Sequence, residues 1–282
     1  FIRKNISNCA VTYDAKFESK ITDRPKLRRK IYLEAGAILN LTSSETLKSF
    51  APEAWMPPAF SVKIEKFEEQ KKVTFELKQR IKKVESNNII ATIKGSDTTV
   101  KEMIVCAHYD HVGGYEACFI PGANDNASGT AMLLELFHYF NEHKPTRTIK
   151  FIAFAGEEVG LVGSKYYVDH ADLDKIEFVL NLDLYGGGSG GLTVVNGKVF
   201  EGPFKELIAI NAQNNYVSKI KSRGEAANSD HYYFSLNGVS AFFIYSNGTV
   251  GGYHNIKDTL EELEVGYFNN MFLLLKDFIS KI

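Results

Sequence analysis

The sequence predicts an α/β protein: a mixed, mostly parallel, twisted sheet with helices on both faces. Strand-length apolar runs alternate along the chain with helical patterns, which is typical of such sheets. The 282 residues are enough to bury a substantial core and to carry a small accessory piece. Several apolar runs end in an acidic residue or a histidine, and the edge of an open α/β sheet where strands end is where ligands bind.

The first sixty residues differ from the rest of the chain. A basic cluster at residues 26–30 precedes a short helix-to-strand pattern at residues 31–41, and three prolines, Pro52, Pro57 and Pro58, interrupt the next segment. We therefore expect residues 1–60 to form an accessory segment and residues 61–282 to form the main domain. A small subdomain without function and a lid over a site fit this segment equally well.

From residue 73 the pattern becomes regular. Val73, Phe75 and Leu77 alternate with polar residues, which predicts a half-buried strand that continues toward Ile81. Further strands are expected at residues 89–93, 103–107, 149–155, 178–182, 192–195 and 241–245. Helices are expected at residues 130–141, 162–170, 203–214 and 230–236, with an amphipathic closing helix at residues 271–279.

Composition excludes some classes of function. The formal net charge of -1 and the pI of about 6.7 give no sign of a polyanionic partner, so we do not expect nucleic-acid binding. No apolar stretch approaches the roughly 20 residues that a membrane span requires. The chain begins at Phe1 without an initiator methionine or a signal-like segment, so we expect a processed or trimmed form. Oligomeric state is left open by the sequence.

Two adjacent acidic residues, Glu157 and Glu158, come after the apolar run at residues 149–155. Neighbouring carboxylates at a buried strand end repel each other unless a positive charge lies beside them. A bound cation supplies such a charge. The pair therefore indicates a metal-dependent hydrolase.

A histidine ends the preceding apolar run. His108 comes directly after residues 103–107, and Asp110 lies two residues later, so at strand spacing the two side chains share a face. Carboxylates in this position hold metal-bound imidazoles and fix their tautomer. Asp110 is therefore expected to support His108 from behind the metal.

Three more candidates stand in loops or at the ends of runs. Asp125 lies in a turn-rich loop before a helical pattern, Asp183 comes directly after residues 178–182, and His254 lies in a loop close to the C-terminal helix. Taken singly, each is more often a turn, cap or loop residue than a ligand. Their joint occurrence is what predicts a metal site.

The donor types favour zinc. Nitrogen and carboxylate ligands without a thiolate suit a hydrolytic zinc site that keeps an open position. Two ions about 3.5–4 Å apart need a bridging carboxylate, and an unligated carboxylate beside them can take the proton of a water.

The motifs resemble those of the M28 family of zinc aminopeptidases over about residues 88–282. They are, in order, His108-Tyr109-Asp110, residues 122–129, Phe154-Ala155-Gly156-Glu157-Glu158, Asn181-Leu182-Asp183 and Tyr253-His254. The resemblance implies two zinc ions and peptide substrates that lose their N-terminal residue. It also implies a secreted or periplasmic location and, for the accessory segment, the tail of an incomplete protease-associated insert.

The same resemblance implies a role for each site residue. Asp125 would bridge the two zinc ions, with Glu158 and His254 completing one site and His108 and Asp183 the other. Glu157 would be the general base that activates the water between the metals.

The motif Ser229-Asp230-His231 has two interpretations of equal weight. Asp230 or His231 supports the metal shell, or Ser229 or Asp230 caps the next helix. We keep Asp230 among the supporting residues.

Two other functions remain open beside the aminopeptidase. A glutaminyl-cyclase-like transferase shares the fold and most metal-site residues while using one zinc ion, although Tyr253-His254 is closer to the peptidase pattern. A binding scaffold without catalysis is disfavoured, because a scaffold has no physical need for a buried acidic cluster.

Overall fold

The computed structural model describes residues 10–14, 37–42, 59–63, 84–115, 118–248 and 252–282. It divides the chain into two compact units, Phe1–Val84 and Glu85–Ile282. The sequence led us to expect a division after residue 60, and a strand, Ala59–Lys63, runs across that position. The strand expected at residues 73–81 lies outside the described residues.

The first unit contains a three-stranded parallel sheet. Its strands are β1 (Ala10–Asp14), β2 (Ala37–Thr42) and β3 (Ala59–Lys63), with β2 in the middle. Ile38 of β2 pairs with Val11 on one side and with Ala59 on the other. The strand half of the pattern expected at residues 31–41 is therefore part of β2.

The second unit is built on a seven-stranded sheet with the order β11-β10-β12-β9-β5-β8-β4. Strands β12, β9, β5 and β8 are parallel to their neighbours in this series, whereas β4 is antiparallel to β8 and β10 is antiparallel to β12. The predicted mixed, mostly parallel sheet is thus confirmed. The strands are β4 (Ile89–Ile93), β5 (Glu102–His108), β8 (Ile149–Phe154), β9 (Ile176–Leu182), β10 (Leu192–Val195), β11 (Ile220–Ser222) and β12 (Ser240–Ser246).

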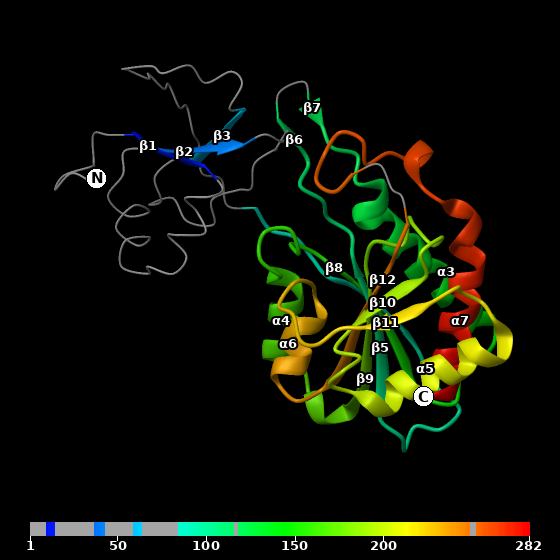
Figure 1. Cartoon of the computed structure of the whole chain (residues 1–282). Coiled ribbons are helices and arrows are strands. Elements are labelled where there is room, and N and C mark those ends of the chain that lie inside the picture. The colour runs from blue at the N-terminus through cyan, green and yellow to red at the C-terminus, as the bar shows by residue number, and fades with distance from the viewer. Residues whose placement is uncertain (1–9, 15–36, 43–58, 64–83, 116–117, 249–251) are drawn as a thin grey trace. The chain divides into compact units, whose positions relative to one another are not determined.

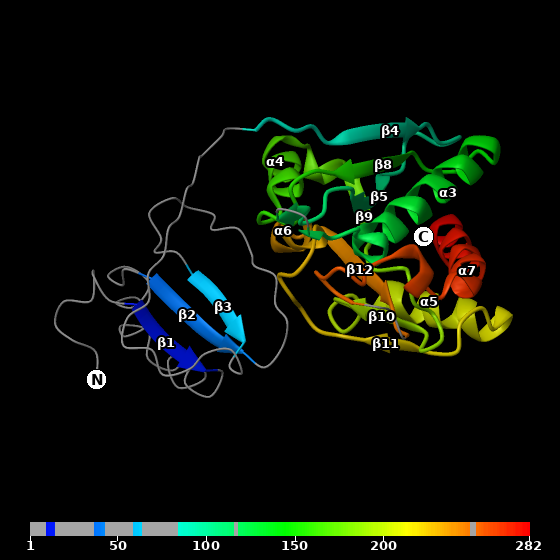
Figure 2. The same ribbon diagram turned by 90° about the horizontal axis from the view of Figure 1, so that it is seen from above.

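Helices cover both faces of this sheet (Figure 1, Figure 2). One face carries α3 (Gly129–Glu142), α5 (Glu201–Asn214) and α7 (Phe268–Lys281), and the other carries α4 (Val162–His170) and α6 (His231–Leu236). The remaining elements are short: β6 (Gly114–Tyr115), β7 (Cys118–Phe119), η2 (Ala123–Ser128), η3 (Leu173–Lys175), η4 (Leu260–Glu262) and η5 (Val265–Tyr267).

Helical periodicity explains how α3 and α7 pack on the sheet. The buried residues of α3 recur on one face of the helix, at Met132, Leu133, Leu136 and Phe140. They share a core with Leu274 of α7 and with the inner side chains of β5, β8 and β9. On the opposite face, α4 and α6 enclose a second core of ten buried residues.

The carboxyl ends of three neighbouring strands meet at one edge of the sheet. His108, the last residue of β5, is in register with Phe154 at the end of β8, and Cys106 is in register with Asn181 near the end of β9. From β5 the chain continues to β8 on one side, then crosses back to β9 on the other. Such a reversal opens a crevice above the strand ends, where ligands bind in open α/β sheets.

None of the described helices has both the length and the apolar character needed to cross a membrane.

Candidate metal centre

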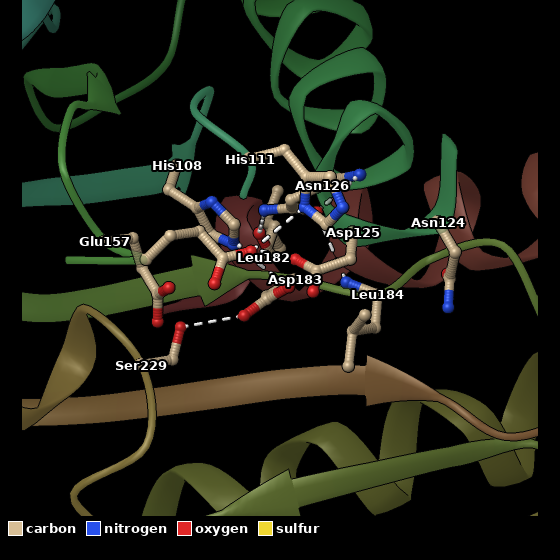
Figure 3. A network of polar contacts seen from close by, with 12 residues as sticks. His108, His111, Asn124, Asp125, Asn126, Glu157, Leu182, Asp183, Leu184 and Ser229 are labelled. Atoms are coloured by element: carbon tan, nitrogen blue, oxygen red, sulfur yellow. Dashed lines mark hydrogen bonds and ion pairs between the residues drawn. The ribbon is translucent and has the colours of Figure 1, made fainter. Parts of the chain in front are cut away.

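The ends of β5 and β9 bring His108 and Asp183 together above the sheet. His108 Nε2 lies 3.4 Å from Asp183 Oδ1 and 3.3 Å from Asp125 Oδ1, and all three side chains are buried. Figure 3 shows their polar ends converging, with Glu157 beside His108. His108, Glu157 and Asp183 each offer one ligand atom, and these atoms lie within 4.8 Å of one another.

A second group of ligand atoms forms around His254. Its Nε2 lies 3.0 Å from Asp125 Oδ2 and 3.0 Å from Glu158 Oε2. His111 also belongs to this group, because its Nδ1 lies 3.0 Å from Glu158 Oε1. The structure thus brings all five expected ligands together.

His111 is a site residue that sequence reasoning did not select. Three residues after His108, it has the sequence context of a polar loop residue. The available signal was its place between the end of β5 and the loop that carries Asp125, but a loop histidine alone does not specify which way its ring turns.

Two distant segments fix the backbone around Asp125. The Asp258 carboxylate accepts the backbone N–H groups of Asn124, at 2.6 Å, and Asp125, at 3.1 Å. The Asn126 side chain donates to the Leu182 carbonyl at the end of β9 and accepts the backbone N–H of Leu184. The loop that leads into α3 is therefore tied to β9 and to the C-terminal segment.

Asp258 was not among the expected site residues. It is buried, with 1% of its surface exposed, and both of its carboxylate oxygens are used by the Asp125 loop. Nothing in its local sequence distinguishes it from a surface acid.

Several buried atoms at this site make no hydrogen bond to any described residue. They include His108 Nε2, Asp183 Oδ1 and His254 Nε2. A buried polar atom without a partner costs about 1–3 kcal/mol. Imidazole nitrogens and carboxylate oxygens are zinc ligands, so the donor set fits zinc at this site.

Charges of opposite sign shift the pKa values of the cluster. Burial by itself would lower the pKa of His108, but Asp125 and Asp183 outweigh it and raise that pKa well above its usual value. Burial would also lower the pKa of His254, but Asp125 and Glu158 raise it to about 10. Burial would raise the pKa of Asp125, but the imidazoles of His108 and His254 lower it. A divalent cation would compete with the protons that these imidazoles attract.

The pKa of Glu157 shifts in the opposite direction from those of Asp125 and Glu158. Its burial, reinforced by the charges of Asp183, Asp230 and Glu158, raises its pKa to about 9, although His108 opposes this. A cation beside it would lower that pKa, because a positive charge stabilises the carboxylate. With a metal bound nearby, Glu157 is therefore suited to exchange a proton near neutral pH.

Asp110 supports the site in a different way from the one expected. His108 Nδ1 bonds the backbone carbonyl of Asp110 at 3.0 Å, while the Asp110 carboxylate is 3.9 Å from that nitrogen. The carboxylate instead accepts the backbone N–H groups of Glu157 and Glu158, at 3.1 and 3.2 Å. The closest partner of His108 Nδ1 is thus the Asp110 carbonyl rather than the expected carboxylate, because the chain turns after β5 and presents the carbonyl there.

The motif at residues 229–231 contacts the site through Ser229. Its hydroxyl donates to Asp183 Oδ2 at 2.9 Å (Figure 3). The same hydroxyl accepts the Asn181 amide at 2.8 Å. Neither Ser229 nor Asp230 caps α6 with its side chain. Asp230 is fully buried, and desolvation raises its pKa to about 7 despite the opposing effects of Ser164 and His108.

Comparison with known proteins agrees with this geometry. The family model of peptidase family M28 matches residues 88–279. Aminopeptidase YwaD of Bacillus subtilis is 32% identical over 216 residues, a match that covers 69% of this chain and 44% of that protein. The chain thus spans less than half the length of that curated relative.

Solved structures share the fold. BSAP, a zinc aminopeptidase from Bacillus subtilis, matches with a TM-score of 0.65 and 25% identity, covering 88% of this chain and 64% of that one. An Acidobacteriales bacterium glutaminyl cyclase matches with a TM-score of 0.58 and 20% identity, covering 69% and 73%. With the family model matched from β4 through α7, the chain belongs to peptidase family M28.

Proposed function

We propose that this chain is a two-zinc aminopeptidase domain, which removes the N-terminal residue of a peptide. The arrangement of Asp125 carries this proposal. Its Oδ1 faces His108, and its Oδ2 faces His254. A bridge between two metal ions requires a carboxylate that offers one oxygen to each side.

The remaining ligands divide in the same way. His108, Asp183 and Asp125 would hold one zinc ion, and Glu158, His254 and Asp125 would hold the other. Aminopeptidase YwaD and the zinc aminopeptidase BSAP, as relatives of this chain, support a zinc-dependent aminopeptidase activity.

The chain's own residues would supply the proton transfers. Zinc ions, when bound, act as Lewis acids that acidify water and polarise the scissile carbonyl. Glu157 lies beside Glu158, and we assign it no ligand role, so its carboxylate can take the proton of the attacking water. It can then give that proton to the amine that leaves, as a general base and acid does in turn. Asp110 holds the backbone of Glu157 in place for this exchange.

The substrate class and the location are proposed from the family resemblance. We expect the substrates to be peptides with a free N-terminus, and we expect the protein to be secreted or periplasmic. Detection of the protein in culture medium or a periplasmic fraction would test the location.

The experiment that tests the proposal combines metal content with two activities. Purified protein is analysed by mass spectrometry for zinc, then assayed on a panel of aminoacyl-anilides and on glutaminyl peptides. Two zinc ions per chain, with anilide hydrolysis abolished by a chelator, is the expected result. One zinc ion with pyroglutamate formation would assign the chain to the cyclase alternative, and no metal with no turnover would leave only a binding scaffold.

A further inference from the structure

His111 lies within the second group of candidate ligand atoms, where it hydrogen-bonds Glu158 and contacts the ring of His254. Its side chain is 11% exposed, and its Nδ1 lies 3.0 Å from Glu158 Oε1. The ring also meets the edge of the His254 ring, with 5.6 Å between the centroids. The imidazole is therefore enclosed beside two residues that would bind the second zinc ion.

The direction of the His111–Glu158 hydrogen bond is set by the chemistry of the acceptor. An ionised carboxylate has no proton to donate, so Nδ1 must carry the hydrogen. A carboxylate that binds a metal ion is ionised. With zinc held by Glu158, His111 would therefore be the donor.

The two oxygens of Glu158 have different partners. Oε1 is hydrogen-bonded to His111, while Oε2 lies 3.0 Å from His254 Nε2, among the candidate ligand atoms. A carboxylate held by one oxygen can turn only about that contact. His111 therefore selects Oε2 as the oxygen that faces a metal ion.

The loop that carries Asp125 makes room for the imidazole. Gly122 has a φ of 71°, and a Cβ on this residue would lie 2.6 Å from Cγ and from Cδ2 of His111. That distance is far inside van der Waals contact. The absence of a side chain at Gly122 thus lets the His111 ring lie against the loop.

We propose that His111 is a positioning residue for Glu158, which it holds as a one-oxygen ligand of the second zinc ion, and that His111 is not itself a ligand. This inference rests on the proposed two-zinc function. Partners of this kind typically change metal affinity by about 10–100-fold when they are removed.

Three substitutions separate positioning from ligation. His111→Ala removes the donor. His111→Asn keeps an N–H donor near the position of Nδ1, and His111→Asp offers a ligand oxygen but places a second negative charge against Glu158. Zinc dissociation constants of both ions are measured by competition with a chromophoric chelator. Thermal unfolding of each metal-free protein shows whether the variant is folded.

Positioning predicts a specific order of zinc affinity. His111→Ala weakens one of the two ions by about 10–100-fold and leaves the other unchanged. His111→Asn restores most of that affinity, and His111→Asp binds the ion more weakly than His111→Ala. A matched control is His170→Asn, since the exposed His170 ring makes a comparable Nδ1 contact, 2.7 Å from the Tyr166 carbonyl, and should have wild-type constants.

Other outcomes overturn the inference in distinguishable ways. If the wild type binds two zinc ions and His111→Ala binds them equally well, His111 has no positioning role. If His111→Asn is as weak as His111→Ala while His111→Asp retains affinity, His111 is a ligand. If the wild type binds no zinc, the proposed function fails together with this inference.

Discussion

The carboxylate of Asp258 accepts the backbone N–H of Asp125 at 3.1 Å, although 133 residues separate the two in the sequence. Through this bond the segment before α7 fixes the residue that we place between two metal ions. The second oxygen of Asp258 accepts the N–H of Asn124, so the contact restrains two successive residues of the loop. Loop geometry at the centre is therefore set from the far end of the chain.

Replacing Asp258 with Ala should damage the whole metal centre. Two buried N–H groups would lose their acceptor, at about 1–3 kcal/mol each, and the loop would no longer hold Asp125 for either ion. We expect a lower free energy of unfolding in urea for the metal-free protein and weaker binding of both zinc ions. Asp97→Ala is the control, because the exposed Asp97 also accepts a backbone N–H, from Thr99, far from any ligand. Retention of both zinc affinities would show that the loop holds its shape without Asp258.

Replacing Glu157 with Gln should abolish turnover and spare the metals. Gln has nearly the same shape but cannot accept the proton of water, so kcat should fall by about 100- to 10,000-fold. Zinc content by mass spectrometry and the thermal unfolding midpoint should match the wild type. A variant with near-normal kcat would remove Glu157 from the role of base.

Replacing Ser229 with Ala should weaken one zinc ion selectively. The Ser229 hydroxyl donates a hydrogen bond to Asp183 Oδ2, which leaves Asp183 Oδ1 facing His108. Without the hydroxyl, affinity for the ion at His108 and Asp183 should fall by about 10–100-fold, measured by chelator competition.

The control for this variant is Thr193→Val. Thr193 is also buried and likewise accepts an asparagine amide, from Asn247 at 3.0 Å, but it lies on β10 away from the ligands. Equal zinc affinity in Ser229→Ala and Thr193→Val would contradict the selective role of Ser229.

The stability of the metal-free protein should fall in acid through His231. Its ring is buried against Phe243, and burial lowers its pKa from 6.5 to about 4. The neutral form is thus favoured by folding, so this contribution is fully present above pH 6.5 and is lost as the pH falls toward 4. The loss amounts to about 3 kcal/mol at pH 4, from 1.36 kcal/mol per pKa unit.

The free energy of unfolding in urea, measured between pH 7.5 and 4, tests this role of His231. His231→Phe has no proton to bind at that position, so its free energy of unfolding should fall less steeply than that of the wild type. His138→Phe, at an exposed histidine, should match the wild-type profile. Parallel profiles for the wild type and His231→Phe would refute the prediction.

The elements of the second unit could be predicted because their signals are local. The expected helix at residues 130–141 is α3 (Gly129–Glu142), and the expected strand at residues 241–245 lies within β12 (Ser240–Ser246). Period-2 and period-3.6 patterns arise from backbone geometry, so neighbouring residues suffice to reveal them.

The candidate ligands could be chosen for a related reason. His108 and Asp183 stand at the carboxyl ends of parallel strands, and such ends meet at one edge of the sheet. Any side chain placed there is brought near the others once the sheet forms. The sequence motifs were needed to choose these residues. Their proximity, in contrast, could be predicted from the fold class alone.

The sequence alone determined the fold class, most elements of the second unit and the candidate ligand set. Only the tertiary structure decided how the candidate ligands are held: Asp258 binds the backbone N–H of Asp125, Ser229 hydrogen-bonds Oδ2 of Asp183, and His111 hydrogen-bonds Oε1 of Glu158. It also placed the Asp110 carboxylate on the backbone N–H groups of Glu157 and Glu158. The physical reason is that a carboxylate or an imidazole turns toward hydrogen-bond partners supplied by distant segments, and local sequence patterns do not encode those partners.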